Sequence, residues 1–180
     1  MDAKNSSVRE IAVPVSVFGS LRRELEKEAG TLPTVHALHH AGYRAGAEAA
    51  DAFSRSSGGD VFSSPRESFW SRLGDFFGKR GWGNLNHEEA HAGVGLLSSA
   101  DWAEASVDEI DPDASCCFST GFLSGLLSQL AGGPVAVLEV ECRTRGEAAC
   151  RFAFGSEGAI HDLYGHLIEG GDLDRALASL

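Results

Sequence analysis

The feature that most constrains the fold is residues 114–138, a stretch without any charged side chain. A run of this length would suit a membrane-spanning helix. Polar residues interrupt it, however, and Gly132-Gly133-Pro134 divides it into two parts. Glycine and proline together end a helix, so we expect a buried helix followed by a buried strand rather than a membrane span.

Hydrophobic periodicity predicts helices on both sides of this stretch and strands in adjacent pairs. The expected helices are 21–29, 31–53, 67–79, 116–130, 159–167 and 172–180. The expected strands are 87–97 and 101–107, joined near 98–100, then 135–142 and 149–154. Residues 11–18 are rich in strand-forming residues, but Pro14 confines them to an edge strand or an extended lead-in. Strands in adjacent pairs predict an α+β fold, in which an antiparallel sheet of two hairpins packs with N-terminal, central and C-terminal helices.

Small residues recur at three- and four-residue spacing on the helix expected at 31–53, at Gly42, Gly46 and Ala49. Such a strip lets another backbone approach closely. We interpret it as tight packing within one domain.

Composition limits the classes of partner and compartment. The chain has 180 residues and a net charge of −11, which disfavours binding to nucleic acid or to anionic membrane surfaces. We expect a flexible N-terminus at 1–9 and one domain at 10–180. Residues 1–10 lack the apolar core of a secretion signal, and four cysteines in such a chain favour a reducing compartment, so a cytoplasmic location is predicted.

All four cysteines lie between Cys116 and Cys150, in a pattern that suggests a metal site. Cys142 and Cys150 are symmetric about Gly146, so a short hairpin would place their side chains opposite each other, as two zinc ligands require. Cys116 begins a predicted helix, whose dipole favours a thiolate. Glu139, on the strand before Cys142, could supply an oxygen ligand.

Two alternatives remain open for these cysteines. Cys142 and Cys150 could form a cross-strand disulfide, or the thiols could be buried without a ligand. A regular strand also sends Glu139 and Cys142 to opposite faces, and Glu141 shares this problem. Glu139 and Cys142 can therefore reach one ion only if the strand bulges or twists.

Residues 116–154 (CCFSTGFLSGLLSQLAGGPVAVLEVECRTRGEAACRFAF) resemble the C-terminal half of the 4-vinyl reductase domain family. That family shows a Cys before a glycine-containing helix, a strand ending in E..C, a Gly turn and a C.F strand. The segments GYRAG (42–46) and GWG (81–83) resemble its N-terminal half.

The resemblance implies a ligand-binding fold shared with NO-signalling and Golgi-transport proteins, usually as a homodimer. It also implies a structural zinc ion bound by Cys116, Glu139, Cys142 and Cys150, with Cys117 as the alternative to its neighbour. Relatives include phenol-sensing domains of bacterial activators, so the implied function is a stand-alone sensor that binds a small hydrophobic or aromatic molecule. The alternatives are a role in tetrapyrrole vinyl reduction, an interaction subunit similar to trafficking relatives, and a redox module that uses Cys116 and Cys117.

Enzymatic activity is not favoured, because the sequence has no dinucleotide, phosphate-loop or nucleophile-elbow motif and a four-ligand zinc site is closed. Aromatic residues at element ends instead suggest a ligand pocket. Trp82 and Trp102 are the leading candidates, because each carries an N–H that can orient a ligand, and Phe118 and Phe122 supply further apolar surface.

One other group of side chains has metal-binding chemistry. His36 and His40 are one helical turn apart, beside His39, and could bind a metal together. An exposed helix face without a ligand is the alternative.

Overall fold

The structure, a computed structural model, describes residues 9–56, 65–105, 111 and 116–180. Its helices are α1 Ser16–Ala29, α2 Thr31–Ser56, α3 Arg66–Gly78, α4 Cys117–Ala131, α5 Glu157–Ile168 and α6 Leu173–Ala178. Its strands are β1 Asn86–His91, β2 Val94–Ser99, β3 Ala136–Glu141 and β4 Cys150–Gly155. The segment predicted to be flexible, residues 1–9, lies outside the described residues except for Arg9.

The four strands form one antiparallel sheet in the order β1-β2-β4-β3. Each hairpin contributes two neighbouring strands, and β2 pairs with β4 to join the hairpins. The predicted α+β class with an antiparallel sheet of two hairpins is therefore confirmed. Within the described part of the chain, no helix is both long enough and apolar enough to cross a bilayer.

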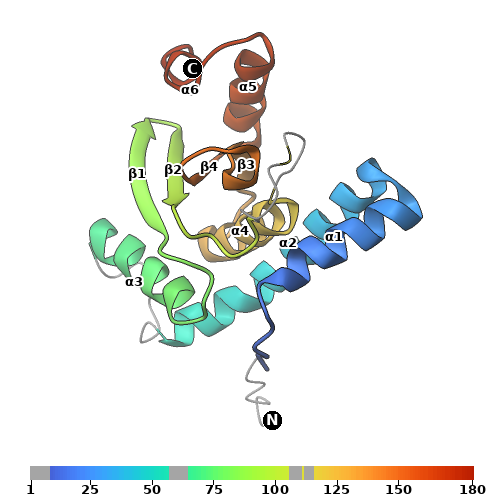
Figure 1. The fold of residues 1–180 in the computed structure, drawn as a ribbon. Helices are drawn as coiled ribbons and strands as arrows, with labels where there is room; N and C mark the ends of the chain where they lie inside the picture. Colours follow the sequence, from blue (N-terminus) through green and yellow to red (C-terminus); the bar gives the residue numbers. More distant parts are fainter. Residues whose placement is uncertain (1–8, 57–64, 106–110, 112–115) are drawn as a thin grey trace.

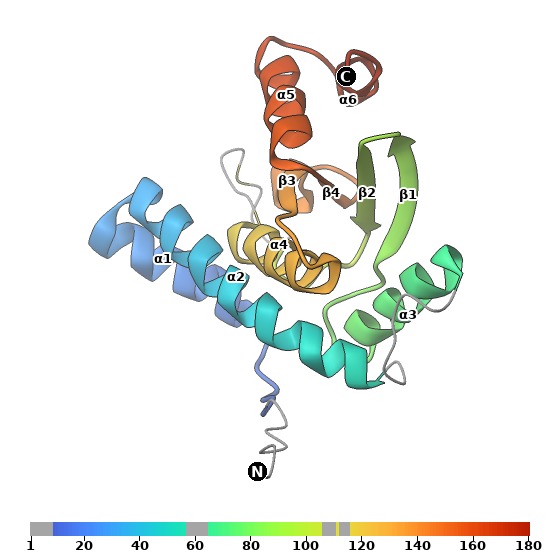
Figure 2. The same ribbon diagram turned by 180° about the vertical axis from the view of Figure 1, so that it is seen from behind.

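Helices cover both faces of the sheet, so the molecule has three layers (Figures 1 and 2). Alternation along the strands divides the core in two. Leu97 and Phe152 point into a core shared with α2, α3 and α4. Leu96 and Ala153 point the other way, into a smaller core under α5 and α6. The helix pair α1–α2 extends past the sheet, with α1 alongside the N-terminal half of α2 (Figure 2).

The central stretch forms the predicted buried helix followed by a strand. α4 contains ten buried residues and ends at Gly132, whose φ of 67° is favoured by glycine. β3 follows as an edge strand of mostly partial burial.

Glycines allow α2 and α4 to cross at backbone contact. A Cβ on Gly46 would lie 1.9 Å from the carbonyl oxygen of Phe122, and one on Gly42 2.0 Å from that of Phe118. In return, a Cβ on Gly121 or Gly125 of α4 would lie 2.0 Å from an α2 carbonyl oxygen. The predicted close-packing strip on α2 is confirmed, with a matching strip on α4.

Two predicted boundaries are wrong. Residues 16–18 belong to α1 rather than to a strand, because the charged face of Leu21–Ala29 extends back by one turn, and only the segment before Val15 is an extended lead-in. The first hairpin turns at Ala92-Gly93 rather than at 98–100. Ser98 and Ser99 resemble turn residues, but they pair with Arg151 and Cys150 of β4.

Candidate metal centre

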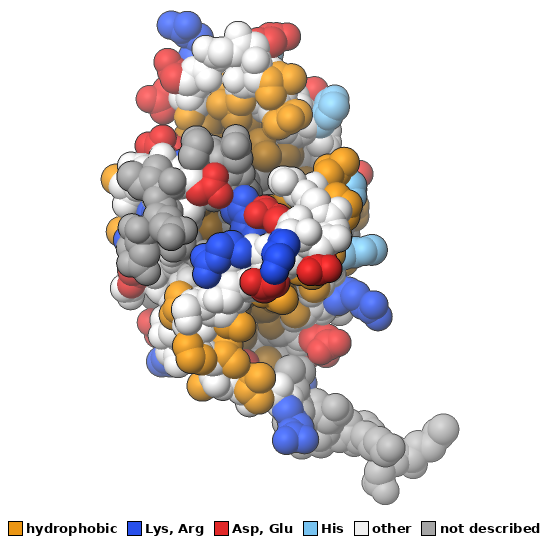
Figure 3. Space-filling view, turned by 45° about the vertical axis from the view of Figure 1, so that its right-hand side comes forward, with side chains coloured by type: hydrophobic (Ala, Val, Ile, Leu, Met, Phe, Trp, Pro, Cys, Tyr) orange, Lys and Arg blue, Asp and Glu red, His pale blue; other side chains and the backbone are white. Residues whose placement is uncertain are grey.

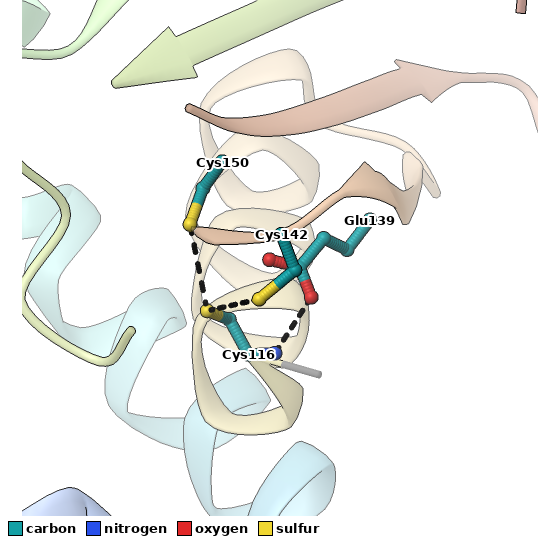
Figure 4. A group of neighbouring side chains, drawn as sticks. All are labelled: Cys116, Glu139, Cys142 and Cys150. Carbon is teal, nitrogen blue, oxygen red and sulfur yellow. Dashed lines mark hydrogen bonds between the residues drawn. The ribbon is translucent and has the colours of Figure 1, made fainter. Parts of the chain in front are cut away.

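Four side chains converge where α4 meets the second hairpin: Cys116, Glu139, Cys142 and Cys150. Cys116 is the residue before α4, Glu139 lies in β3, Cys142 follows that strand and Cys150 begins β4. One donor atom from each lies within 4.8 Å of the others, and all four side chains are buried. Figure 4 shows the three sulfur atoms and the carboxylate facing a common centre.

A bulge in β3 makes this convergence possible. Glu139 pairs with Phe152 and Glu141 with Arg151, so two residues of β3 advance against one of β4. The extra residue reverses the alternation of side chains before Cys142. The sequence argument required such a bulge for Glu139 and Cys142 to share a centre, and the structure contains it.

The sulfur atoms are spaced for a shared ion rather than for a disulfide. The Sγ of Cys116 lies 3.8 Å from that of Cys142 and 3.9 Å from that of Cys150. Tetrahedral zinc with Zn–S bonds of about 2.3 Å places its sulfurs about 3.8 Å apart, whereas a disulfide needs about 2 Å. All four cysteines of the chain are reduced, so the disulfide alternative is not what this structure contains.

The carboxylate of Glu139 joins the centre to α4. Its Oε2 accepts a hydrogen bond of 2.7 Å from the backbone N–H of Cys116. Its Oε1 is buried and has no hydrogen-bond partner among the described residues. A buried acceptor of this kind is costly unless a ligand occupies it, and a metal ion would do so.

Electrostatics in the centre also favours a cation. Hydrogen bonds to Cys142 and Cys150, together with burial, raise the pKa of the Cys116 thiol well above its usual value. Burial, followed by the nearby charge of Cys142, raises the pKa of Glu139 to about 8. Hydrogen bonds from Cys116 and Cys150 lower the pKa of Cys142. The group therefore resists carrying more than one negative charge unless a positive ion balances it.

The cysteine ambiguity is resolved by position. Cys116, not Cys117, contributes its sulfur to the cluster. Cys117 is also buried, but it lines a separate cavity on the α2 side of α4.

A second carboxylate at the start of α4 was missed by the sequence reasoning. Glu104 accepts hydrogen bonds of 2.9 Å and 2.6 Å from the backbone N–H groups of Phe118 and Ser119, and another from the Ser119 hydroxyl. Trp102 donates its indole N–H to the same hydroxyl oxygen at 2.7 Å. Burial raises the pKa of Glu104 to about 7, although these hydrogen bonds favour its charged form. The only sequence signal is that α4 lacks a capping side chain of its own at its N-terminus.

The four predicted pocket aromatics form one cluster around the first two turns of α4. Trp82 lies 5.5 Å from Trp102, 6.1 Å from Phe118 and 5.4 Å from Phe122, measured between ring centroids. Trp102 is 1% exposed, whereas Trp82 is half-buried.

Two cavities are described, and neither is lined by the predicted aromatic residues. One, of about 540 Å³, lies between α2, the start of α4 and β3. The other, of about 450 Å³, lies at the turn between β1 and β2.

Comparison with known proteins agrees with this geometry. The model of the 4-vinyl reductase domain matches residues 104–156. This segment therefore matches the predicted family. The match covers less than a third of the chain, but it includes Glu104 and all four residues of the centre, so the predicted resemblance is confirmed for this part. A search of curated proteins finds no match.

Three solved structures share the fold of the chain well beyond the matched segment. The phenol-responsive sensory domain of the transcription activator PoxR, solved with phenol, has a TM-score of 0.66 and 19% identity, covering 91% of this chain and 85% of that one. A trafficking protein particle complex subunit 3 from Naegleria fowleri, covalently bound to palmitic acid, has a TM-score of 0.64 and 15% identity, covering 78% and 91%. A vinyl-4-reductase family protein from Methanocaldococcus jannaschii has a TM-score of 0.55 and 16% identity, covering 81% and 83%.

Proposed function

We propose that this chain is a zinc-stabilised sensor or binding domain for a small hydrophobic or aromatic molecule. The observation that carries this proposal is that one helix end holds both parts of the system. Cys116 of the centre directly precedes α4, and Phe118 and Phe122 of the aromatic cluster lie in its first two turns. The similar fold of a sensory domain solved with phenol supports an aromatic ligand.

The proposed metal is zinc, in a structural role. Three thiolates and one carboxylate match the sulfur and oxygen ligands that zinc accepts, and four protein ligands leave no open position for substrate. The N–H of Cys116 holds the Glu139 carboxylate in place, as outer hydrogen bonds do in metal sites. When bound, zinc supplies a cross-link between α4 and the second hairpin.

The proposed ligand contacts are Trp82, Trp102, Phe118 and Phe122. Half-buried Trp82 is the ring of this cluster through which a ligand would enter, because Trp102 is buried and its N–H is bonded to Ser119. An aromatic ligand would replace ring contacts of Trp82 with equivalent contacts of its own.

The metal proposal is tested by measuring zinc in protein purified without chelator. We expect about one zinc per chain for the unmodified protein and less than about a tenth for Cys142→Ser, because zinc sites need all their ligands. Cys117→Ser is the matched control, since it removes a buried thiol one residue from the cluster and should retain zinc. A metal-free unmodified protein would refute the proposal.

The ligand proposal is tested by thermal shift with phenol and with a porphyrin. A ligand at 100 times its dissociation constant adds about 2.7 kcal/mol to the free energy of unfolding, so the melting temperature should rise for the zinc-loaded protein. Trp82→Leu should remove the rise, whereas Trp70→Leu, in the neighbouring α3 cluster, should keep it. If neither compound raises the melting temperature while zinc is present, an interaction subunit becomes the better interpretation.

We also propose that the chain forms a homodimer in the cytoplasm. Val17 and Leu21 lie one turn apart on α1 and are 38% and 47% exposed, and hydrophobic side chains gather in the lower part of the face in Figure 3. A second copy would cover such residues. Sedimentation should show a dimer that Leu21→Glu dissociates and that Ile168→Glu, at an exposed site on α5, leaves intact. The reduced cysteines support a reducing compartment.

A further inference from the structure

The cavity of about 540 Å³ beside the metal centre has walls from three elements. α2 supplies Val35 and three histidines, α4 supplies Cys117 and Thr120, and β3 supplies residues 137–139. The proposed ligand contacts are not part of it. Its donor groups are imidazoles, a thiol and a carboxylate, which are the three kinds of ligand that zinc takes from proteins.

The histidines stand at the outer part of this cavity. His36 and His40 are exposed and one helical turn apart, and His39 is partly buried between them. Burial, together with repulsion from His40 and His36, lowers the pKa of His39, so its imidazole is neutral and able to bind a metal at neutral pH.

Glu139 connects the cavity to the centre. It lines the cavity wall, and it is also one of the four clustered side chains. Glu139 is 7% exposed, whereas the three cysteines of the centre are 0–1% exposed. Among the described residues, it is therefore the ligand of the centre that is nearest to solvent. Cys117, on the same wall, is next to Cys116 in the chain.

Charge favours a cation as the occupant. The chain carries a net charge of −11, so its field attracts positive ions and repels anions. No lysine or arginine lies among the described residues that line this cavity. Imidazoles therefore offer the side-chain nitrogen donors of its wall, and they bind divalent transition metals without opposing the charge of the ion.

We propose that this cavity is the port through which a divalent transition metal ion enters and leaves the centre. His36, His39 and His40 bind the ion first, and Glu139 then receives it at the inner wall. Each thiol of the centre that binds the ion releases its proton to solvent, and no group is oxidised or reduced. This proposal rests on the metal centre proposed above.

The test measures how fast metal-free, full-length protein takes up Co²⁺, followed by the absorption of cobalt–thiolate bonds. We compare the unmodified chain with His36→Ala/His39→Ala/His40→Ala. The matched control is His161→Ala/His166→Ala, which removes histidines from α5. We expect the cavity variant to bind cobalt roughly tenfold more slowly, the lower end of the loss that groups outside the ligand sphere cause in metal affinity. The control should keep the unmodified rate.

Final stoichiometry separates the two proposals. About one cobalt per chain in all three proteins, with slow uptake only in the cavity variant, supports the port and shows that the variant still folds a complete centre. Equal rates at full stoichiometry overturn the port alone. If the unmodified chain binds no cobalt at its thiols, both the centre and the port are overturned. Release of bound zinc to a coloured chelator should show the same order of rates, and equal release rates would also contradict the port.

Discussion

At the scale of single residues, Glu139 joins the chemistry of the centre to the backbone of α4. One oxygen accepts the N–H of Cys116 and the other has no hydrogen-bond partner in the described part of the chain. Glu104 accepts the N–H groups of Phe118 and Ser119 in the first turn of the same helix. Two carboxylates thus take the place of a side-chain cap, in a position that the helix dipole favours.

Glu104 should make stability depend on pH. Its pKa is raised from 4.5 to about 7 by burial, so the folded chain keeps a proton that the unfolded chain has lost between these values. The free energy of unfolding of the unmodified protein should therefore fall as pH rises from about 4.5 to 7. Glu104→Gln, which carries no charge, should lack this fall, as measured by urea denaturation of zinc-loaded protein at several pH values.

The control for this prediction is Glu28→Gln, which changes an exposed carboxylate of α1 and should follow the unmodified pH profile. The comparison between variants cancels the contribution of other groups, including Glu139. A Glu104→Gln profile parallel to that of the unmodified protein would contradict the prediction.

At the scale of elements, the contact between α2 and α4 positions the rest of the site. Reciprocal glycines let the two backbones touch, which aligns the start of α4 with β3 and brings His39 and Cys117 to one cavity. The bulge in β3 then turns Glu139 and Cys142 toward the helix end. The centre therefore depends on helix packing as much as on its ligands.

Gly46→Ala should destabilise the fold strongly. The added Cβ would lie 1.9 Å from the carbonyl oxygen of Phe122, so the helices must separate. We expect the free energy of unfolding to fall by about 3 kcal/mol or more, at the upper end of the usual cost of overpacking. Urea denaturation measures this change.

Gly165→Ala in α5 is the matched control, because nothing lies within 4 Å of its added Cβ. Replacing a helical glycine without steric conflict should be neutral or should add up to about 1 kcal/mol. Equal effects of the two substitutions would show that helix propensity, and not the close crossing, sets the cost.

At the scale of the whole molecule, the two cores lie on opposite faces of one sheet. The centre belongs to the larger core, together with Trp102, Phe122 and Phe152. A metal ion there would join the central helix to the sheet and thereby stabilise the layer that carries the aromatic cluster.

Removal of zinc by a chelator should therefore lower the melting temperature of the chain. A ligand held at 1,000 times its dissociation constant contributes about 4 kcal/mol, which corresponds to roughly 10 °C for a protein of this size. Added zinc should restore the original value. The melting temperature of Cys142→Ser should be insensitive to the chelator, and equal sensitivity of the two proteins would argue against the centre.

Local pattern was sufficient to predict the α+β class, the buried α4–β3 pair and the metal-binding set of Cys116, Glu139, Cys142 and Cys150, because periodicity and residue spacing are properties of the chain itself. Tertiary structure decided the rest. Ser98 and Ser99 lie in a strand only because β4 pairs with them, and Glu104 caps α4 from outside the helix. The cavity at His39 exists because glycines from two distant segments meet. Contacts between segments far apart in the chain leave no periodic trace in either segment, so only the folded molecule specifies them.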